Sequence, residues 1–276
     1  IDAGESWLSA NAALPNLWVY SVLVDPTNGD NVYAGTWSGA YSSADGGQTW
    51  ISASSGLTNR NINTLITTSR APLRMLAGTR AGIFASIDGA ASWSGVNSGL
   101  KAASVERVAV DRAASGSLYT AVEDHLYKTS DWGNSWELLL TTQIAALPIY
   151  QPITSVVIDP QSPETVYVGS EGGGLLKSTD GGASWTLVDL GPFINTIAID
   201  RLTPTTLYAS SNGDIYKSLD GGDSWNPANS GMSAYAVEEL AIDPLTPATI
   251  YAGTYGGEVY SSNDGGDTWS PAFTGL

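Results

Sequence analysis

The chain has 276 residues, 42% of them hydrophobic, which is enough to bury the core of one large domain or two small ones. Its 27 acidic and 11 basic residues give a formal charge of −16, which argues against nucleic acids and anionic membranes, because both attract cationic surfaces. The chain has no cysteine and one histidine, which excludes disulfides, thiolate chemistry and multi-histidine metal sites. We therefore expect no cofactor, no nucleic-acid partner and no membrane insertion, and the composition leaves the oligomeric state open.

One octet recurs along the chain, and we call each copy a box. STDGGASW at 178–185 is typical; the six complete copies end at Trp50, Trp93, Trp136, Trp185, Trp225 and Trp269, and a shortened one ends at Trp7. The box aspartates are Asp2, Asp45, Asp88, Asp131, Asp180, Asp220 and Asp264. Their successive spacings are 43, 43, 43, 49, 40 and 44 residues. This period is typical of a four-stranded propeller blade.

Three short apolar runs precede each complete box, and we name them strands A, B and C. In chain order they read SVLVDP, NVYAGT and GAYSSA; NTLITTS, RMLAGT and GIFASI; VERVAVD, SLYTAV and HLYKTS; SVVIDP, TVYVGS and GLLKST; NTIAID, TLYASS and DIYKSL; ELAIDP, TIYAGT and EVYSSN. A fourth run, strand D, begins at the box tryptophan. The runs are rich in β-branched and aromatic residues and bounded by Gly, Pro, Asn and Asp, as strands are.

Each box is expected to close the turn between strands C and D. Its Asp can accept hydrogen bonds from N–H groups two or three residues ahead, and its Gly can adopt a positive φ. Its Trp brings a large apolar side chain to the blade edge. Ala90 replaces the second glycine of one box, so we expect strain or an altered turn there.

The boxes resemble the Asp-box, or bacterial neuraminidase repeat, of a class of β-propellers. The resemblance covers essentially the whole chain and is nearest to the photosystem II assembly factors, with the sortilin ectodomain and xyloglucan hydrolases next. It implies an all-β propeller of four-stranded antiparallel blades, and it implies little about function, because the motif occurs in catalytic and non-catalytic members.

The blade count has two solutions. Six sets of strands A, B and C accompany seven boxes, so the N-terminal box has only a strand D. We expect a single propeller domain over residues 1–276, with units ending near 50, 93, 136, 185, 225 and 269. We expect six complete blades and an N-terminal remnant strand in a fragment of a longer chain, and the alternative is that they form part of a seven-bladed ring.

A ligand is expected opposite the boxes. In a propeller the C–D and A–B turns share one face, and the D–A and B–C loops form the other, around the channel mouth, where concave sites occur. Side chains outside the repeat pattern gather in these latter loops. The candidates for ligand binding are Trp18, Trp37, Tyr150, Phe193, Tyr235, Tyr255, Arg80 and Glu171. The competing interpretation is that the aromatic side chains only anchor their loops.

A glycosidase is the main catalytic alternative. Glu123, Glu171 and Glu258 lie in the same loops, and a catalytic pair would need a separation of roughly 5–9.5 Å. A sialidase is disfavoured, because Arg70, Arg74 and Arg201 fall in or near A–B turns, on the box face. His125 follows two acids and could act as a base, although a solvated loop histidine is the plainer reading.

These observations predict a non-catalytic binding or scaffolding propeller of an exported or cell-surface protein, with a protein or glycan as ligand. The alternatives are a glycoside hydrolase, xyloglucanase-like or sialidase-like, and a purely structural module of a larger assembly. No residue is assigned a catalytic role and no metal site is expected.

Overall fold

The computed structural model describes residues 8–11, 14, 18–67, 74–101, 104–110, 116–141, 152–232 and 236–272. These residues form six four-stranded antiparallel sheets and contain no helix. The protein is therefore an all-β propeller with six blades over the described residues, which confirms the fold class expected from the repeats.

The first three blades contain the strands β1 to β12. Blade 1 is β1 (Val19–Asp25), β2 (Asn28–Thr36), β3 (Gly39–Ser43) and β4 (Ile51–Ser52). Blade 2 is β5 (Ile62–Thr67), β6 (Met75–Thr79), β7 (Gly82–Ser86) and β8 (Ser94–Gly95). Blade 3 is β9 (Val105–Val110), β10 (Leu118–Val122), β11 (His125–Thr129) and β12 (Glu137–Thr141).

The last three blades contain the strands β13 to β24. Blade 4 is β13 (Ile153–Ile158), β14 (Val166–Ser170), β15 (Gly174–Ser178) and β16 (Thr186–Val188). Blade 5 is β17 (Ile194–Ile199), β18 (Leu207–Ser211), β19 (Asp214–Ser218) and β20 (Asn226–Pro227). Blade 6 is β21 (Val237–Ile242), β22 (Ile250–Thr254), β23 (Val259–Ser262) and β24 (Ser270–Pro271).

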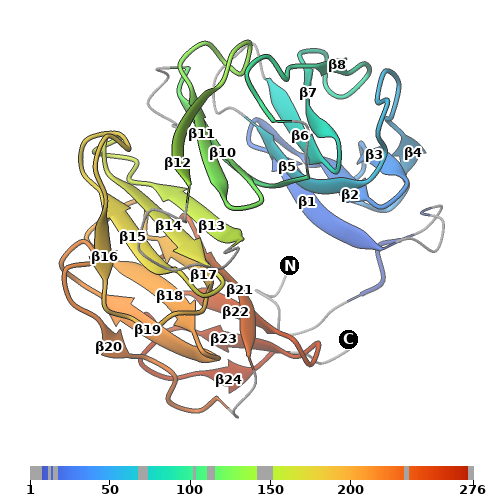
Figure 1. Ribbon diagram of the computed structural model, residues 1–276. Coiled ribbons are helices and arrows are strands. Elements are labelled where there is room, and N and C mark those ends of the chain that lie inside the picture. Colours follow the sequence, from blue (N-terminus) through green and yellow to red (C-terminus); the bar gives the residue numbers. More distant parts are fainter. Residues whose placement is uncertain are drawn as a thin grey trace. The chain divides into compact units, whose positions relative to one another are not determined.

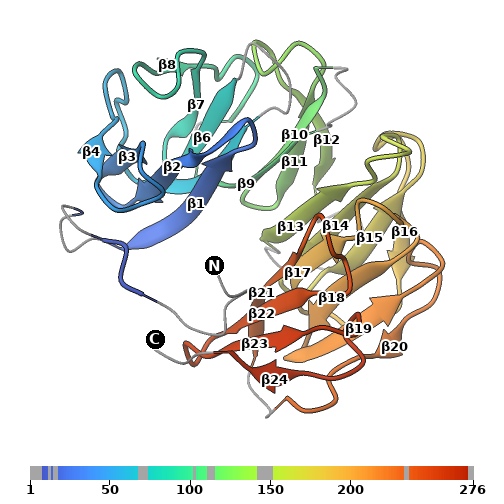
Figure 2. The same cartoon turned by 180° about the vertical axis from the view of Figure 1, so that it is seen from behind.

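Every blade pairs its strands in chain order, and the four correspond to the expected strands A to D. The chain divides into two compact units: residues 9–141 contain β1–β12, and residues 142–276, with 1–8, contain β13–β24. Within each unit the A strands of consecutive blades lie side by side, as the views in Figures 1 and 2 show. The expectation of a single domain over the whole chain stays a prediction.

The hydrophobic core lies between consecutive blades. Tyr167 and Leu175 of blade 4 pack with Ile194, Ile197 and Leu207 of blade 5 in one buried cluster. Clusters of the same kind join blades 1 and 2, blades 2 and 3, and blades 5 and 6. Strands B and C in the middle of a blade are packed on both faces, which explains their nearly continuous apolar sequence.

The N-terminal remnant is described only in part, because Asp2 and Trp7 lie outside the described residues. Ala10 accepts a hydrogen bond from the Trp50 indole Nε1 at 2.8 Å. Ala53 accepts the equivalent bond from Trp93, and Val96 accepts it from Trp136. Ala10 stands three residues after Trp7, as Ala53 does after Trp50 and Val96 does after Trp93. The N-terminal remnant therefore supplies an acceptor carbonyl to blade 1, as blades 1 and 2 do to the blades that follow them.

Candidate functional site

The six described boxes are turns closed by their own side chains. In the fourth blade the Ser178 hydroxyl donates to Asp180 Oδ1 at 2.8 Å and accepts the N–H of Gly182 at 2.9 Å. The other end of the turn is held by Ser184, whose N–H and hydroxyl donate to the two Asp180 oxygens at 2.8 and 2.6 Å. The same four bonds recur at Asp45, Asp88, Asp131, Asp220 and Asp264.

The turn differs from the sequence expectation in which backbone N–H group donates to the aspartate. The carboxylate accepts an N–H four residues ahead in every described copy, because the turn encloses two residues with positive φ, Gly181 and Gly182 in the fourth blade. The hydroxyl of Ser184, followed by its N–H, lowers the pKa of Asp180 from its ordinary value to about 2. Ala90 has a positive φ of 68° like the glycines it replaces, which agrees with the strain expected at that position.

The box tryptophans pack on blade edges. Trp50, Trp93, Trp136 and Trp269 are buried, and each donates its indole N–H to a carbonyl 40 or 41 residues earlier in the chain. Trp185 and Trp225 instead donate to the carbonyls of Gly182 and Gly222 within their own turns. With its acids and its tryptophans engaged in this way, the box has a structural role.

The opposite ends of the blades are held together by one repeated backbone bond. The first residue of a B–C loop donates its N–H to the carbonyl of the residue before strand A of the same blade. The pairs are Trp37 to Trp18, Arg80 to Asn61, Glu171 to Pro152, Asn212 to Phe193 and Tyr255 to Ala236, at 2.9–3.3 Å. The residue at this first position of the B–C loop differs from blade to blade, whereas the residues of the box are repeated. The backbone alone makes this contact, so it leaves the side chains free to differ.

In the unit of residues 9–141, two candidate aromatic residues meet on blade 1. Trp18 is 73% exposed and Trp37 is 58% exposed, and the backbone bond between them is 3.3 Å long. Arg80 is exposed at the position in blade 2 that Trp37 holds in blade 1. Two indoles and, on the next blade, a guanidinium are thus presented to solvent at this end of the unit.

In the unit of residues 142–276, Phe193 and Glu171 are brought together. They form an isolated antiparallel bridge between neighbouring blades, and the Phe193 side chain is 48% exposed. Tyr255 is 85% exposed on blade 6. The remaining two candidates, Tyr150 and Tyr235, lie outside the described residues.

The acidic residues of these loops have separate environments. Glu123 holds a positive φ of 57°, Glu171 is exposed, and Glu258 accepts a hydrogen bond from the Tyr260 hydroxyl at 3.1 Å. His125 begins strand β11, and its Nδ1 lies 2.6 Å from Oδ1 of the buried Asp124. The reading of His125 as a solvated loop residue is therefore wrong: strand pairing places it partly inside the blade.

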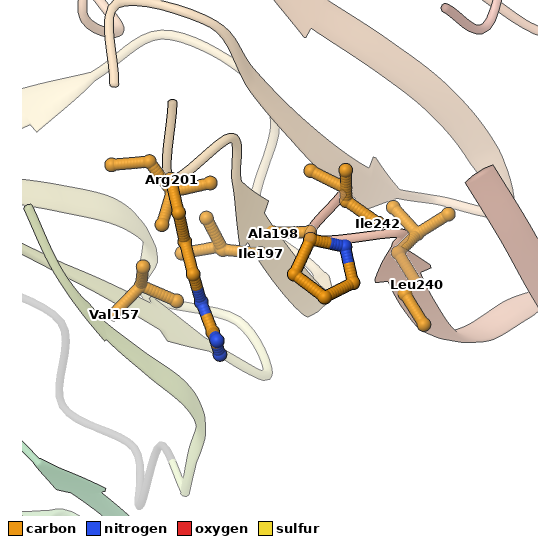
Figure 3. A pocket seen from close by; sticks show the side chains of 9 residues that line it. Val157, Ile197, Ala198, Arg201, Leu240 and Ile242 are labelled. Carbon is orange, nitrogen blue, oxygen red and sulfur yellow. The ribbon is translucent and has the colours of Figure 1, made fainter. Parts of the chain in front are cut away.

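The sequence analysis missed a cavity at the other end of the A strands. It has a volume of about 320 Å³ and lies within the unit of residues 142–276. Its walls include Val157 from β13, Ile197 and Ile199 from β17, and Leu240 and Ile242 from β21, together with Arg201 (Figure 3). None of the candidate ligand-binding residues lines it. The sequence signal was an Asp-Arg pair at 200–201, where neighbouring units have Asp-Pro at 159–160 and 243–244.

The described residues lack two further features. No group of three or more His, Asp or Glu side chains is arranged to hold a metal ion among them. No helix of the described part of the chain is long and apolar enough to cross a membrane.

Comparison with known proteins shows the fold. No family model matches the chain, and no curated protein matches its sequence. Among solved structures, an ancestral GH74 enzyme has a TM-score of 0.76 at 21% identity, over 88% of this chain and 36% of that one. YCF48 from Cyanidioschyzon merolae has a TM-score of 0.70 at 17% identity, over 94% and 85%. The extracellular domain BT4673 from B. thetaiotaomicron has a TM-score of 0.69 at 17% identity, over 96% and 34%.

These similar structures include enzymes and proteins of other kinds. YCF48 has also been solved bound to D1 peptide. The chain spans 36% of the GH74 structure and 34% of the extracellular domain. At these identities the likeness establishes a β-propeller and leaves the activity to be argued from the residues.

Proposed function

We propose that this protein is a non-catalytic binding propeller of an exported or cell-surface protein, with a protein or glycan as its ligand. The ligand contacts the end of the blades formed by the D–A and B–C loops. The observation that carries the proposal is the exposed pair Trp18 and Trp37 on blade 1. Indole side chains bury large areas at little conformational cost, and they are frequent at binding hot spots.

The contrast between the two ends of a blade supports this choice. Where the fold needs a particular side chain, the repeats keep it, as at Asp45 and Trp50 and their counterparts. At the first position of the B–C loop the fold needs only a backbone N–H, yet blade 1 has Trp37 and blade 6 has Tyr255. Exposing an aromatic ring to water is unfavourable, so folding alone does not account for these residues.

The similar structures make both ligand classes reasonable. One of them, YCF48, is known with a bound peptide, and GH74 proteins are named as enzymes of a glycoside hydrolase family. The extracellular domain among them is consistent with an exported location.

The test uses intrinsic tryptophan fluorescence and glycan and peptide arrays on the whole chain. We expect a ligand identified on the arrays to bind at least about tenfold more weakly to Trp37→Ala and Trp18→Ala. Leu245→Ala is the control, because Leu245 is another strongly exposed apolar residue, in an A–B turn at the other end of blade 6. Unchanged affinity in both tryptophan variants, with correct folding, would rule the proposal out.

A glycoside hydrolase is the second candidate, favoured by the exposed residues Glu171 and Phe193, whose backbones pair between neighbouring blades. An aromatic platform next to a carboxylate suits a sugar substrate. Release of reducing ends from xyloglucan, abolished in Glu171→Gln and retained in Leu245→Ala, would support this candidate over simple binding. Binding of xyloglucan without hydrolysis would reject it.

A further inference from the structure

The cavity at the ends of strands β13, β17 and β21 has the size and lining of a small-molecule site. Its volume of about 320 Å³ is at the lower end of the range of roughly 300–1,000 Å³ that ligand pockets occupy. Aliphatic side chains of three consecutive A strands, among them Val157, Ile197 and Leu240, form the wall. The aliphatic part of this wall favours contact with an apolar ligand body.

Arg201 adds one charge to this wall. In Figure 3 the Arg201 side chain lies between Val157 on one side and Ala198, Leu240 and Ile242 on the other. A guanidinium in this position can pair with a carboxylate through two parallel N–H bonds.

The turn that bears Arg201 does not require an arginine. Asp200 accepts the N–H of Leu202 at 2.9 Å, and Asp243 accepts that of Leu245 at 2.8 Å in the equivalent turn of blade 6. The residue after the aspartate is Pro160 in blade 4 and Pro244 in blade 6. Proline suits this position because its φ is already fixed for a turn. Arginine follows the strand A aspartate in two repeats, as Arg201 in blade 5 and as Arg112 in the third repeat, so the repeat accepts an arginine at this position without requiring it.

The Arg201 guanidinium also has no partner within the part of the chain that the structure describes. No hydrogen bond or ion pair joins it to a described residue, whereas Lys177 and Lys217 pair with Asp223 and Asp267. Burial lowers the pKa of Arg201 from its ordinary value. Arg201 is nevertheless exposed to solvent as a whole, so its guanidinium is accessible to an incoming carboxylate.

We propose that this cavity binds a small organic acid, with its apolar body against the aliphatic wall and its carboxylate on the Arg201 guanidinium. We expect both parts in the ligand, because the aliphatic side chains offer contact to a hydrocarbon chain and the guanidinium donates its strongest hydrogen bonds to an anion. This site is separate from the tryptophan pair of the proposed function and does not depend on it.

The experiment compares three probes on the whole chain by calorimetry and by methyl NMR. Hexanoate has both parts, hexan-1-ol has only the apolar body, and acetate has only the carboxylate. We expect hexanoate to bind saturably and to shift the methyl signals of Ile197 and Ile242. Hexan-1-ol and acetate should each bind at least about tenfold more weakly, since each lacks one of the two contacts.

Variants of the site provide the decisive comparison. Arg201→Pro gives blade 5 the residue of its neighbours and should weaken hexanoate binding at least about tenfold, while Arg201→Lys should weaken it less. Ala198→Phe should block the cavity, and Leu245→Ala and Trp37→Ala should bind hexanoate as the parent does. Arg201→Gln replaces the proline variant if thermal unfolding shows that the latter misfolds. The proposal would be overturned if Arg201→Pro, or Arg201→Gln in its place, bound hexanoate as tightly as the parent does. It would also be overturned if hexanoate caused no saturable shift of the methyl signals of Ile197 and Ile242.

Discussion

Gly99 lies at a close backbone contact between two neighbouring blades. It has a φ of +87°, and a Cβ at this position would overlap the carbonyl oxygen of Trp136. Trp136 in turn donates its N–H to the carbonyl of Ser98 at 2.8 Å. Gly56 faces Trp93 and Gly231 faces Trp269 in the same way. The glycine after the box thus permits the next box tryptophan to dock on the blade before it.

We predict that Gly99→Ala lowers the free energy of unfolding by about 2–4 kcal/mol, because it adds a backbone clash to the cost of a left-handed conformation. Gly46→Ala is the matched control: Gly46 also has a positive φ, +69°, but a Cβ there meets nothing within 4 Å. It should cost only about 1 kcal/mol. Urea denaturation of both variants provides the measurement, and equal losses would contradict the role assigned to the close approach.

Asp180 links stability to pH. Its pKa is lowered to about 2 in the folded protein by hydrogen bonds from Ser184 and Ser178. A depressed carboxyl pKa stabilises the folded state above the unfolded pKa, and this contribution is lost as pH falls through the folded pKa. The box should therefore lose stability between about pH 5 and about pH 2.

We predict that Asp180→Asn is less stable than the parent at neutral pH and that this difference shrinks as the pH falls toward about 2. The variant lacks the titrating group, so it loses less over this range. Thermal unfolding of both proteins at several pH values tests this. A difference that is constant with pH would show that the charge of Asp180 is unimportant.

At the scale of the element, a strand B tyrosine joins blade 4 to the box of blade 5, and another joins blade 5 to the box of blade 6. The hydroxyl of Tyr208 donates to the Gly265 carbonyl at 2.7 Å, and that of Tyr167 donates to Gly221 at 2.7 Å. Lys217 lies 5.8 Å from the Tyr208 ring centroid and pairs with Asp267 at 3.2 Å. A box is thus held by its own turn and also by the preceding blade.

Tyr208→Phe should lower the free energy of unfolding by about 1–2 kcal/mol, because it removes a partly buried hydrogen bond and leaves the Gly265 carbonyl without this donor. Tyr167→Phe should cost about the same, since the contact repeats one blade earlier. Tyr255→Phe, on a side chain that is 85% exposed, should change stability little. The result would be contradicted if all three variants unfolded at the same urea concentration.

At the scale of the whole molecule, the dominant property is charge. A net charge of −16 on 276 residues disfavours the folded state through mutual repulsion, and salt screens this repulsion. We predict that the melting temperature at pH 7 rises when NaCl is increased from about 0.01 M to about 0.5 M. Near the isoelectric point of about 4.1 the rise should be smaller. A melting temperature at pH 7 that falls or stays constant with salt would contradict this prediction.

The sequence by itself determined the all-β propeller, the four strands of each blade and the structural role of the boxes. It could do so because each of these depends on local patterns repeated six times: strand periodicity, turn residues and a tryptophan at a fixed position. Because the box is repeated, the single departure at Ala90 did not obscure the pattern. The hydrogen bonds within the turn were harder to predict from the sequence, because two successive positive φ values decide which N–H group donates to Asp180.

Only the tertiary structure decided which side chains meet and which are exposed. Trp18 and Trp37 come together because strands A and B of one blade are antiparallel, and Phe193 meets Glu171 because neighbouring blades are in contact. The cavity beside Arg201 depends on three A strands from separate repeats, and no single repeat contains it. Sequence reasoning assigned Arg201 to the unproductive face, because packing between blades, which creates a cavity there, is a long-range property that local patterns do not specify.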